Sequence, residues 1–394
     1  MPRFPEVAPS VAAIPGSVYS LLSHRLERYR GEIYPLSVGD TWMEPPPGCR
    51  MEDFRVADHP GMHRYAPVQG IPELVLRLAE RVERRSGART GPENILMTTG
   101  ATGGLSTVAG ALLAPGDEVL ILAPYWPLIS GIVRSFHGTP VPVPFLAAPD
   151  PSYALPDSPE TAVEQVARHR TDRTVALYLS TPNNPSGLAI PRAWIEALVE
   201  WACREGLWIL ADEVYEDYLY EGEHAYTRPL APERTFAAHS FSKAFGMAGN
   251  RCGYIVGPAG SMGDLRKVST HGFYSTPTAS QLAGLAALSP AGDAWIENAR
   301  GLYAETGAKA AARLGVPAPK GSTFLFLDVS ERLAADPDGR GLEGFLGDCV
   351  DEGLLLSPGP SFGPYPNHVR VCFTAAPPDR VGRGIEILAR RLGR

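Results

Sequence analysis

Short apolar runs alternate with amphipathic stretches between residues 72 and 260, and this alternation predicts the main part of the fold. The strand-like runs are NILMTT, DEVLILAP, TVALYLS, LWILADE, TFAAHS and RCGYIVG. Around them, stretches such as IPELVLRLAERVERRSG and PRAWIEALVEWACREG carry apolar residues at helical spacing and end in glycine. Apolar strands that alternate with amphipathic helices indicate a mostly parallel sheet covered by helices on both faces. The sequence therefore predicts an α/β fold.

The pattern changes after about residue 279. A helical stretch over 279–315 is interrupted near Pro290, and the extended runs TFLFLDV, LLLSPG and HVRVCFTAA follow, with a helix near 342–352 and another at the C-terminus. This is an α+β pattern, and it predicts a smaller second domain. The first forty residues precede the first strand–helix unit, so we expect them to pack with it. We assign residues 44–285 to a large, ligand-binding domain and residues 1–43 and 286–394 to the small domain.

Composition excludes several classes of partner. The chain of 394 residues has a net charge of −7 and no long basic run, which argues against a nucleic-acid partner. No apolar run approaches the roughly 20 residues of a membrane span, and the N-terminal stretch lacks a signal-type apolar core. The five cysteines are scattered and form no CxxC pair, so we expect a reduced, cytoplasmic chain without a zinc site.

Polar residues follow several of the predicted strands. Gly100-Ala101-Thr102 comes after NILMTT, and Asn184 comes after TVALYLS. Asp212 lies near the end of LWILADE, and Tyr215 follows this run. Ser242 and Lys243 come directly after TFAAHS. In open α/β sheets, ligands bind at the carboxyl ends of the strands. These residues therefore predict one common site.

The residue types in these loops indicate a chemistry. A glycine turn that opens a helix offers backbone N–H groups and a positive dipole end to a phosphate, and Ser240, Thr102 and Arg251 could add side-chain donors. Asp212, at the end of a buried strand, needs a cationic partner. A phosphate site, a buried carboxylate and a lysine together match pyridoxal 5′-phosphate, with Lys243 as the Schiff-base residue.

With these residues the chain resembles a known family, the fold-type I, class I/II aminotransferases that use pyridoxal phosphate. The matching segments occur in the family's order between residues 34 and 373. They are YPLSVGDTW, RYAPVQGIPEL, TTGATGG, APYWP, NNPSG, ADEVYEDY, the pair SFSK and GNRCGY, and VRVCF. The resemblance implies a seven-stranded sheet in the large domain, a homodimer, and amino acids and 2-oxo acids as substrates.

The resemblance also implies a role for each matching residue. Lys243 would carry the cofactor and move the proton, and Asp212 would pair with the ring nitrogen. The remaining cofactor contacts would be Asn184 and Tyr215 on the ring oxygen, Trp126 on the ring face, and Ala101, Thr102, Ser240, Ser242 and Arg251 on the phosphate. Arg370 would hold the substrate α-carboxylate, beside Gly39 and Asn184.

Two residues would act across the predicted dimer. Tyr65 would reach the phosphate of the cofactor in the neighbouring subunit. His271 stands where dicarboxylate-specific members carry an arginine from the neighbouring subunit, so it would contact substrate there. Without that arginine, we expect a neutral, aromatic or aliphatic amino donor to be preferred over aspartate.

Other functions remain open from the sequence. A carbon–sulfur lyase or a cyclising enzyme could use the same ring contacts, because these reactions differ in which bond at Cα breaks. A non-catalytic, pyridoxal phosphate-binding regulator domain is a more distant alternative. A nicotinamide-dependent dehydrogenase lacks support, since no GxGxxG follows a predicted strand.

Overall fold

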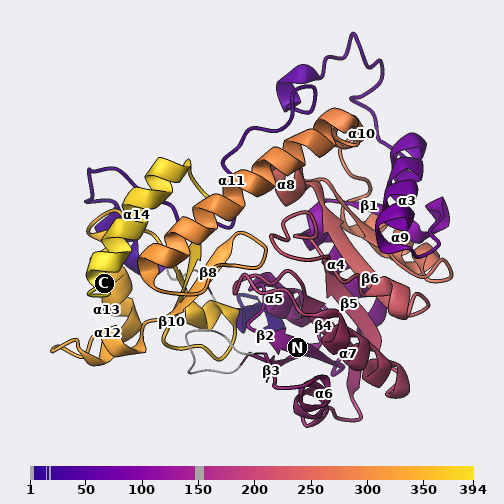
Figure 1. Ribbon diagram of the computed structural model, residues 1–394. Helices are drawn as coiled ribbons and strands as arrows, with labels where there is room; N and C mark the ends of the chain where they lie inside the picture. Colours follow the sequence, from indigo (N-terminus) through magenta and orange to yellow (C-terminus); the bar gives the residue numbers. More distant parts are fainter. Residues whose placement is uncertain (1–3, 15, 17–18, 147–154) are drawn as a thin grey trace.

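The structure is a computed structural model that describes residues 4–14, 16, 19–146 and 155–394. Positions 1–3, 15 and 17–18 of the predicted small domain, and 147–154 of the predicted large domain, lie outside the described residues. The described chain builds a large sheet covered by helices and, beside it, a smaller sheet with its own helices (Figure 1). The predicted α/β class is therefore confirmed.

The large sheet has seven strands in the order β1-β7-β6-β5-β4-β2-β3. Among these strands β7 runs antiparallel to both of its neighbours, and the other six share one direction. The sheet is thus mostly parallel, as predicted. Its strands are β1 (Ile95–Thr98), β2 (Glu118–Ala123), β3 (Thr139–Pro144), β4 (Thr174–Ser180), β5 (Trp208–Asp212), β6 (Thr235–Ser240) and β7 (Gly253–Val256).

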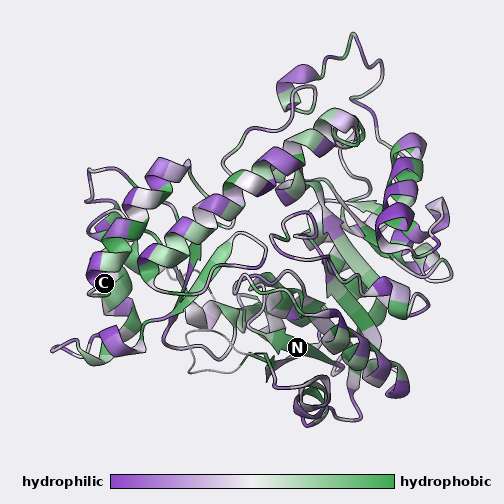
Figure 2. Ribbon diagram, viewed as in Figure 1, coloured by the Kyte–Doolittle hydropathy of each residue, from purple (hydrophilic) through white to green (hydrophobic). Residues whose placement is uncertain are grey.

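Helices with one apolar side cover this sheet (Figure 2). In α3, for example, Leu74, Leu78 and Val82 recur at helical spacing and are buried, and Gly87 ends the helix in the left-handed conformation that glycine favours. The helices of this part are α3 (Pro72–Ser86), α4 (Gly100–Leu112), α5 (Leu128–Ser135), α6 (Pro159–Ala167), α7 (Arg192–Arg204), α8 (Phe241–Ala244), α9 (Met262–Gly272) and α10 (Thr278–Ala287).

The smaller sheet has the antiparallel order β8-β10-β9. Its strands are β8 (Phe324–Asp328), β9 (Ser357–Pro358) and β10 (His368–Cys372). The run LLLSPG forms a shorter strand than its apolar residues indicate, because pairing with β10 involves only Ser357 and Pro358. The helices here are α2 (Tyr19–Leu26), α11 (Pro290–Leu314), α12 (Ser330–Ala334), α13 (Gly341–Val350) and α14 (Pro378–Arg391).

Two hydrophobic cores underlie the two sheets, and α11 extends from one to the other. Ile296, near its start, belongs to the core of the large sheet, whereas Tyr303 and Leu314 belong to the core of the small sheet. The break near Pro290 is present, because α10 ends at Ala287 and α11 begins at Pro290. Near the N-terminus, α2 packs against α13, but α1 (Pro9–Ala12) packs against α5. The domain limits given above stay a prediction.

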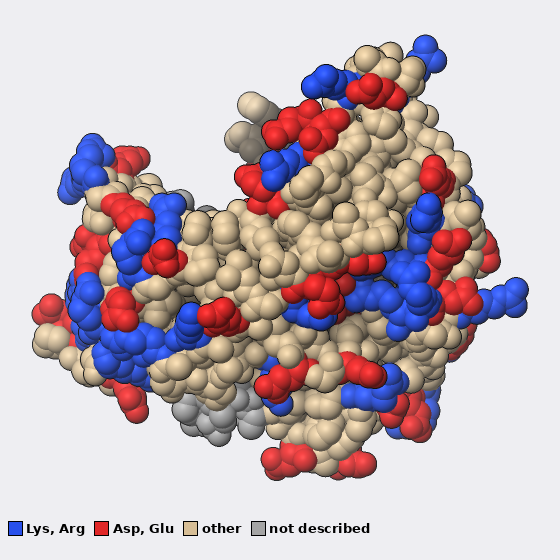
Figure 3. Space-filling model, turned by 45° about the horizontal axis from the view of Figure 1, so that its top comes forward, with Lys and Arg blue, Asp and Glu red and all other residues tan. Residues whose placement is uncertain are grey.

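The surface and the turns complete the description. On the face in Figure 3, acidic and basic side chains lie next to one another, and a broad uncharged area lies between these groups. No helix within the described ranges is long and apolar enough to cross a membrane. Single 3-10 turns occupy Met51–Asp53, Pro92–Asn94, Arg228–Leu230, Ala248–Asn250 and Gly359–Phe362.

Candidate active site

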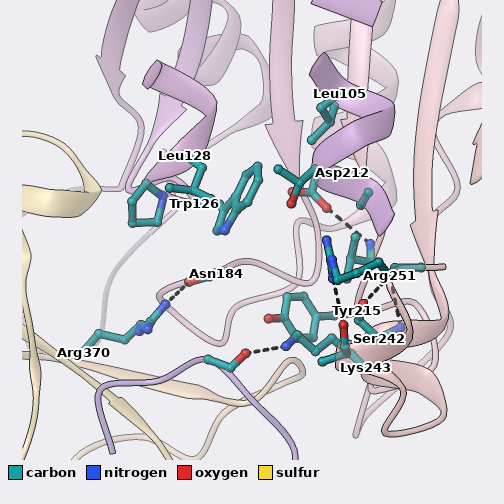
Figure 4. Close-up of a pocket in the computed structure, with 17 residues that line it drawn as sticks. Leu105, Trp126, Leu128, Asn184, Asp212, Tyr215, Ser242, Lys243, Arg251 and Arg370 are labelled. Carbon is teal, nitrogen blue, oxygen red and sulfur yellow. Dashed lines mark hydrogen bonds between the residues drawn. The ribbon is translucent and has the colours of Figure 1, made fainter. Parts of the chain in front are cut away.

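A cavity of about 320 Å³ lies at the carboxyl ends of the large sheet's strands, facing the small sheet (Figure 4). The structure brings most of the predicted site residues to its wall. These are Gly39, Ala101, Thr102, Trp126, Asn184, Asp212, Tyr215, Ser240, Ser242, Lys243, Arg251 and Arg370. Leu105, Pro127, Leu128, Val214 and Ala248, which the sequence did not single out, complete the lining.

Lys243 enters the cavity from the short helix α8, directly after β6. Ser240 caps this helix, because its Oγ accepts the N–H of Ser242 at 3.1 Å. The Lys243 ammonium donates to the backbone carbonyl of Gly39 and lies 3.9 Å from a carboxylate oxygen of Asp40. Burial lowers the pKa of Lys243, and the Asp40 carboxylate opposes this shift. The lysine is thus held between the two sheets with its proton less firmly bound than on a surface lysine.

Asp212, the last residue of β5, is a buried carboxylate without a cation among its hydrogen-bond partners. The Tyr178 hydroxyl donates to Oδ2 at 2.7 Å, and Oδ1 receives a long contact of 3.4 Å from the N–H of Val214. Burial raises the pKa of Asp212 to about 6, although the hydrogen bond from Tyr178 lowers it. A buried carboxylate with so few donors favours a cationic group on the cavity side.

The turn at residues 99–102 and the side chain of Arg251 bring hydrogen-bond donors together at the cavity wall. Gly100 has φ +73°, and a Cβ at this residue would lie 2.6 Å from a guanidinium nitrogen of Arg251. The guanidinium is oriented by the carbonyls of Ala248 and Thr99, at 2.9 and 3.1 Å. Ala101 and Thr102, at the N-terminus of α4, line the cavity together with Ser240 and Ser242, and the Ser240 hydroxyl donates to the Ser242 hydroxyl at 2.8 Å. This donor set suits a phosphate group.

Arg370 enters from β10 in the small sheet and lies opposite Lys243 (Figure 4). Its Nη1 donates to Oδ1 of Asn184 at 2.9 Å, and its Nη2 donates to the carbonyl of Ser37 at 2.6 Å. The rings of Phe324 and Phe362 lie 4.3 and 4.8 Å from the guanidinium carbon. A planar guanidinium fixed in this way can bind a carboxylate through two parallel hydrogen bonds.

Tyr65 and His271 lie outside this cavity. Tyr65 is 83% exposed, and its ring contacts that of Tyr274 at 4.7 Å between centroids. His271 is exposed at the end of α9, where Nδ1 lies 2.8 Å from the carbonyl of Lys267. The roles predicted for both concern the neighbouring subunit, so they stay predictions.

Sequence reasoning missed Tyr178, the partner of Asp212. It is fully buried within the otherwise aliphatic run TVALYLS. The signal was present, since a buried tyrosine needs a hydrogen-bond partner. It lies two residues before the end of β4 and opposite Leu210 on β5, which is two residues before Asp212.

One cofactor accounts for these features together. The donors at residues 99–102 and Arg251 suit a phosphate group, and the Asp212 carboxylate suits a protonated ring nitrogen. The Lys243 amine suits reaction with a carbonyl group. Pyridoxal phosphate carries all three groups. The fold and the site thus define a pyridoxal phosphate-dependent enzyme of the α/β class.

Comparison with known proteins gives the family. The family model for aminotransferase class I and II matches residues 32–388. The aspartate/prephenate aminotransferase of Thermus thermophilus is 35% identical over 376 residues, covering 94% of this chain and 93% of that protein. The arginine–pyruvate transaminase of Pseudomonas aeruginosa is 33% identical over 352 residues, covering 86% and 85%.

Solved structures agree with this assignment. A Thermus thermophilus aspartate aminotransferase, a tetra mutant complexed with tryptophan, matches with a TM-score of 0.85 and 31% identity, covering 98% of this chain and 99% of that one. This chain therefore belongs to the class I and II aminotransferase family, and it is a pyridoxal phosphate-dependent aminotransferase.

Proposed function

We propose that this aminotransferase takes amino groups from neutral amino acids, aromatic or aliphatic, in preference to aspartate, and passes them to a 2-oxo acid in a ping-pong sequence. The apolar wall of the cavity carries this proposal, because Trp126, Pro127 and Leu128 line it near Arg370 (Figure 4). The cations in the described lining are Lys243, Arg251 and Arg370. We assign each of them to the cofactor or to the substrate α-carboxylate, so the described lining of this subunit holds no further cation for a second substrate carboxylate.

The phosphate and the ring of the cofactor would be held by the large sheet. Arg251, Ser240, Ser242, Thr102 and the backbone at Ala101 would bind the phosphate. When bound, pyridoxal phosphate supplies an aldehyde that condenses with amines and a ring that withdraws electrons from Cα of the substrate. Asp212 would hold the proton on the ring nitrogen, and Trp126 would stack on the ring.

Asn184 and Tyr215 would donate to the ring oxygen. Asn184 is suited to this, because its Oδ1 is engaged by Arg370 and its Nδ2 donor is left for a ligand. Tyr215 remains protonated, since burial raises its pKa, and it can therefore act as a donor.

Lys243 and Arg370 would act on the substrate. Arg370 would bind the α-carboxylate in two parallel contacts, with the backbone at Gly39 beside it, and so orient the Cα–H bond. Lys243 would move the proton between Cα and the cofactor carbon, because burial lowers its pKa and makes the free amine more abundant near neutral pH. The carbonyl of Gly39 lies within hydrogen-bonding range of this amine and orients it.

We propose further that the enzyme is a cytoplasmic homodimer in which Tyr65 and His271 serve the site of the other subunit. Exposed apolar side chains between residues 51 and 65 support the dimer, since Met51, Val56 and Tyr65 are 53%, 50% and 83% exposed. The five cysteines, all of them free thiols in the described chain, support the location. Sedimentation that finds an active monomer would contradict the dimer.

The test is incubation of the enzyme with single amino acids and no acceptor. We expect phenylalanine and methionine to convert the bound cofactor to its amine form with one equivalent of 2-oxo acid released, and kcat/KM for them to exceed that for aspartate about tenfold or more. A strong preference for aspartate would overturn the substrate proposal. With an amino acid that carries sulfur on Cβ, such as cystathionine, repeated release of pyruvate, ammonia and the thiol would instead indicate the carbon–sulfur lyase reaction.

Named relatives make this test informative. One is an aspartate/prephenate aminotransferase and another is an arginine–pyruvate transaminase, so similar chains act on quite different donors. The aspartate aminotransferase variant complexed with tryptophan supports the view that this scaffold can hold an aromatic side chain.

A further inference from the structure

The hydroxyl of Tyr178 makes a short hydrogen bond to Asp212 from behind the cavity. Strands β4 and β5 are parallel neighbours, and Ser180 lies opposite Asp212 in their register. Tyr178 lies two residues earlier on β4, and its hydroxyl donates a hydrogen bond to Oδ2 of Asp212 at 2.7 Å. Tyr178 is 0% exposed and Asp212 is 6% exposed. The contact therefore forms away from water, where a hydrogen bond to a carboxylate is strong.

We propose that Tyr178 is a positioning residue for the cofactor ring: it holds Oδ2 of Asp212 so that Oδ1 faces the ring nitrogen. This inference rests on the role proposed above for Asp212. Oδ1 receives only the 3.4 Å contact from Val214, so one oxygen is fixed and the other is available to a ligand. Without the phenol, the carboxylate could turn about its Cβ–Cγ bond and present neither oxygen in a fixed direction.

Two further facts make Tyr178 the group that fixes this carboxylate. Burial keeps the phenol protonated by raising its pKa, so it acts as a donor throughout the neutral range. The other polar ring nearby, His239 on β6, is committed elsewhere: its Nδ1 lies 3.0 Å from Glu216, and its ring stacks on Tyr254 at 4.9 Å.

The charge state of Asp212 supports the same role. Burial alone favours the neutral acid, and the donated hydrogen bond from Tyr178 favours the carboxylate. A neutral acid could not form an ion pair with a protonated ring nitrogen. Tyr178 thus orients the carboxylate and favours its ionised form, together with the N–H of Val214 and the nearby His239.

The experiment measures how well the cofactor-free enzyme distinguishes two ligands. One is pyridoxal phosphate, and the other is an analogue in which a C–H replaces the ring nitrogen. The ratio of their dissociation constants reports the contact between Asp212 and the nitrogen and is insensitive to general loosening of the site. Y178F removes the hydroxyl but keeps the ring, so the core stays filled.

We expect Y178F to lower the preference for pyridoxal phosphate about tenfold, the effect of losing a hydrogen bond to a buried charged group. Y365F is the matched control. Tyr365 is also buried, and its hydroxyl donates to the carbonyls of Ala123 and Leu146 at 2.9 and 3.2 Å, away from Asp212. Its ratio should stay within about twofold of the native value.

One more variant, D212N, keeps the outcomes distinct. D212N should abolish the preference; if it does so while the Y178F ratio stays native, the role of Tyr178 is wrong and that of Asp212 stands. If D212N leaves the ratio unchanged, the proposed role of Asp212 fails, and the inference fails with it.

Discussion

Two hollows of similar size lie in different parts of this molecule, and their charges are arranged differently. The active-site cavity has about 320 Å³, and a groove between α11 and α14 has about 260 Å³. In the groove, charges neutralise one another: Lys309 lies 2.6 Å from Glu305, and Arg313 binds Glu386 at 2.7 Å. Judged by volume alone, both hollows would be equally good candidates for a ligand site.

In the active-site cavity, by contrast, two of the charged groups are held by neutral partners, although the Asp40 carboxylate lies 3.9 Å from Lys243. Arg370 donates to the amide of Asn184, and Asp212 accepts from the phenol of Tyr178. A charge held by neutral groups is oriented without being cancelled, so it remains able to bind an oppositely charged part of a ligand. The comparison shows that the partners of a charge, more than the size of a hollow, mark a catalytic site.

The largest expected effect is that of K243A, which removes the proposed base and the amine that bonds the cofactor. We expect kcat to fall by about 10⁴-fold or more. The matched change in the groove is K309A, which removes an exposed ion pair and should leave kcat within about twofold. Steady-state rates with the best amino donor measure both. Substantial activity in K243A, or a large loss in K309A, would remove the distinction between the two hollows.

The next largest difference between the cavity and the groove is expected when an arginine in each is replaced by lysine. R370K replaces a planar, two-point contact with a single ammonium, so kcat/KM should fall by on the order of 10²–10³-fold. The absorbance of the bound cofactor should persist, because most of the proposed cofactor contacts come from the large sheet. In R313K the pair with Glu386 is exposed, and kcat/KM should be nearly unchanged. Equal losses in the two variants would contradict the role of Arg370.

The smallest expected effects are on stability. Neutralising a carboxylate should stabilise the enzyme at Asp212, in the cavity, and destabilise it at Glu386, in the groove. Folding raises the pKa of Asp212 from 3.8 to about 6, so between these pH values the folded chain binds a proton that the unfolded chain has released. Stability of the cofactor-free enzyme therefore falls as pH rises through this window. D212N removes that penalty and keeps an acceptor for Tyr178. It should stabilise the cofactor-free enzyme by about 1–3 kcal/mol at pH 7 and by little at pH 4.

Glu386 in the groove gives the opposite case. Its hydrogen bond from Arg313 lowers its pKa, so its contribution to stability is present at neutral pH and is lost as the pH falls. E386Q should therefore destabilise the enzyme slightly at pH 7. Denaturant unfolding of both variants at pH 4 and pH 7 checks the two signs. If D212N does not stabilise the enzyme at pH 7, Asp212 carries no such penalty; if E386Q stabilises it, the sign given for Glu386 is wrong.

The sequence was sufficient for the main sheet because most of its strands are continuous apolar runs, which buried parallel strands require. It missed β3, whose sequence TPVPVP reads as a loop. Proline cannot donate to a neighbouring strand, so such a segment is tolerated only at an edge, and β3 is the last strand in the order. That position depends on the topology of the whole sheet, which local pattern does not contain.

For the site, motif spacing was enough to identify groups at strand ends, such as Asn184, Asp212 and Lys243. It was insufficient for Tyr178 and Leu128, because their roles depend on which strand or helix lies beside them. The roles of Tyr65 and His271 stay predictions, because both residues are exposed here and their proposed partners belong to another copy of the chain.

The most direct test of the account uses the scarcity of lysine, since the chain has only Lys243, Lys267, Lys309 and Lys320. Lys267 and Lys309 are exposed and paired with Asp264 and Glu305 at 2.7 and 2.6 Å. Borohydride reduction of the enzyme with its cofactor, followed by peptide mass mapping, locates the amine bonded to the cofactor. We predict one equivalent of label on Lys243 and none on the other three. Label on another lysine, or no stoichiometric label, would contradict the central claim.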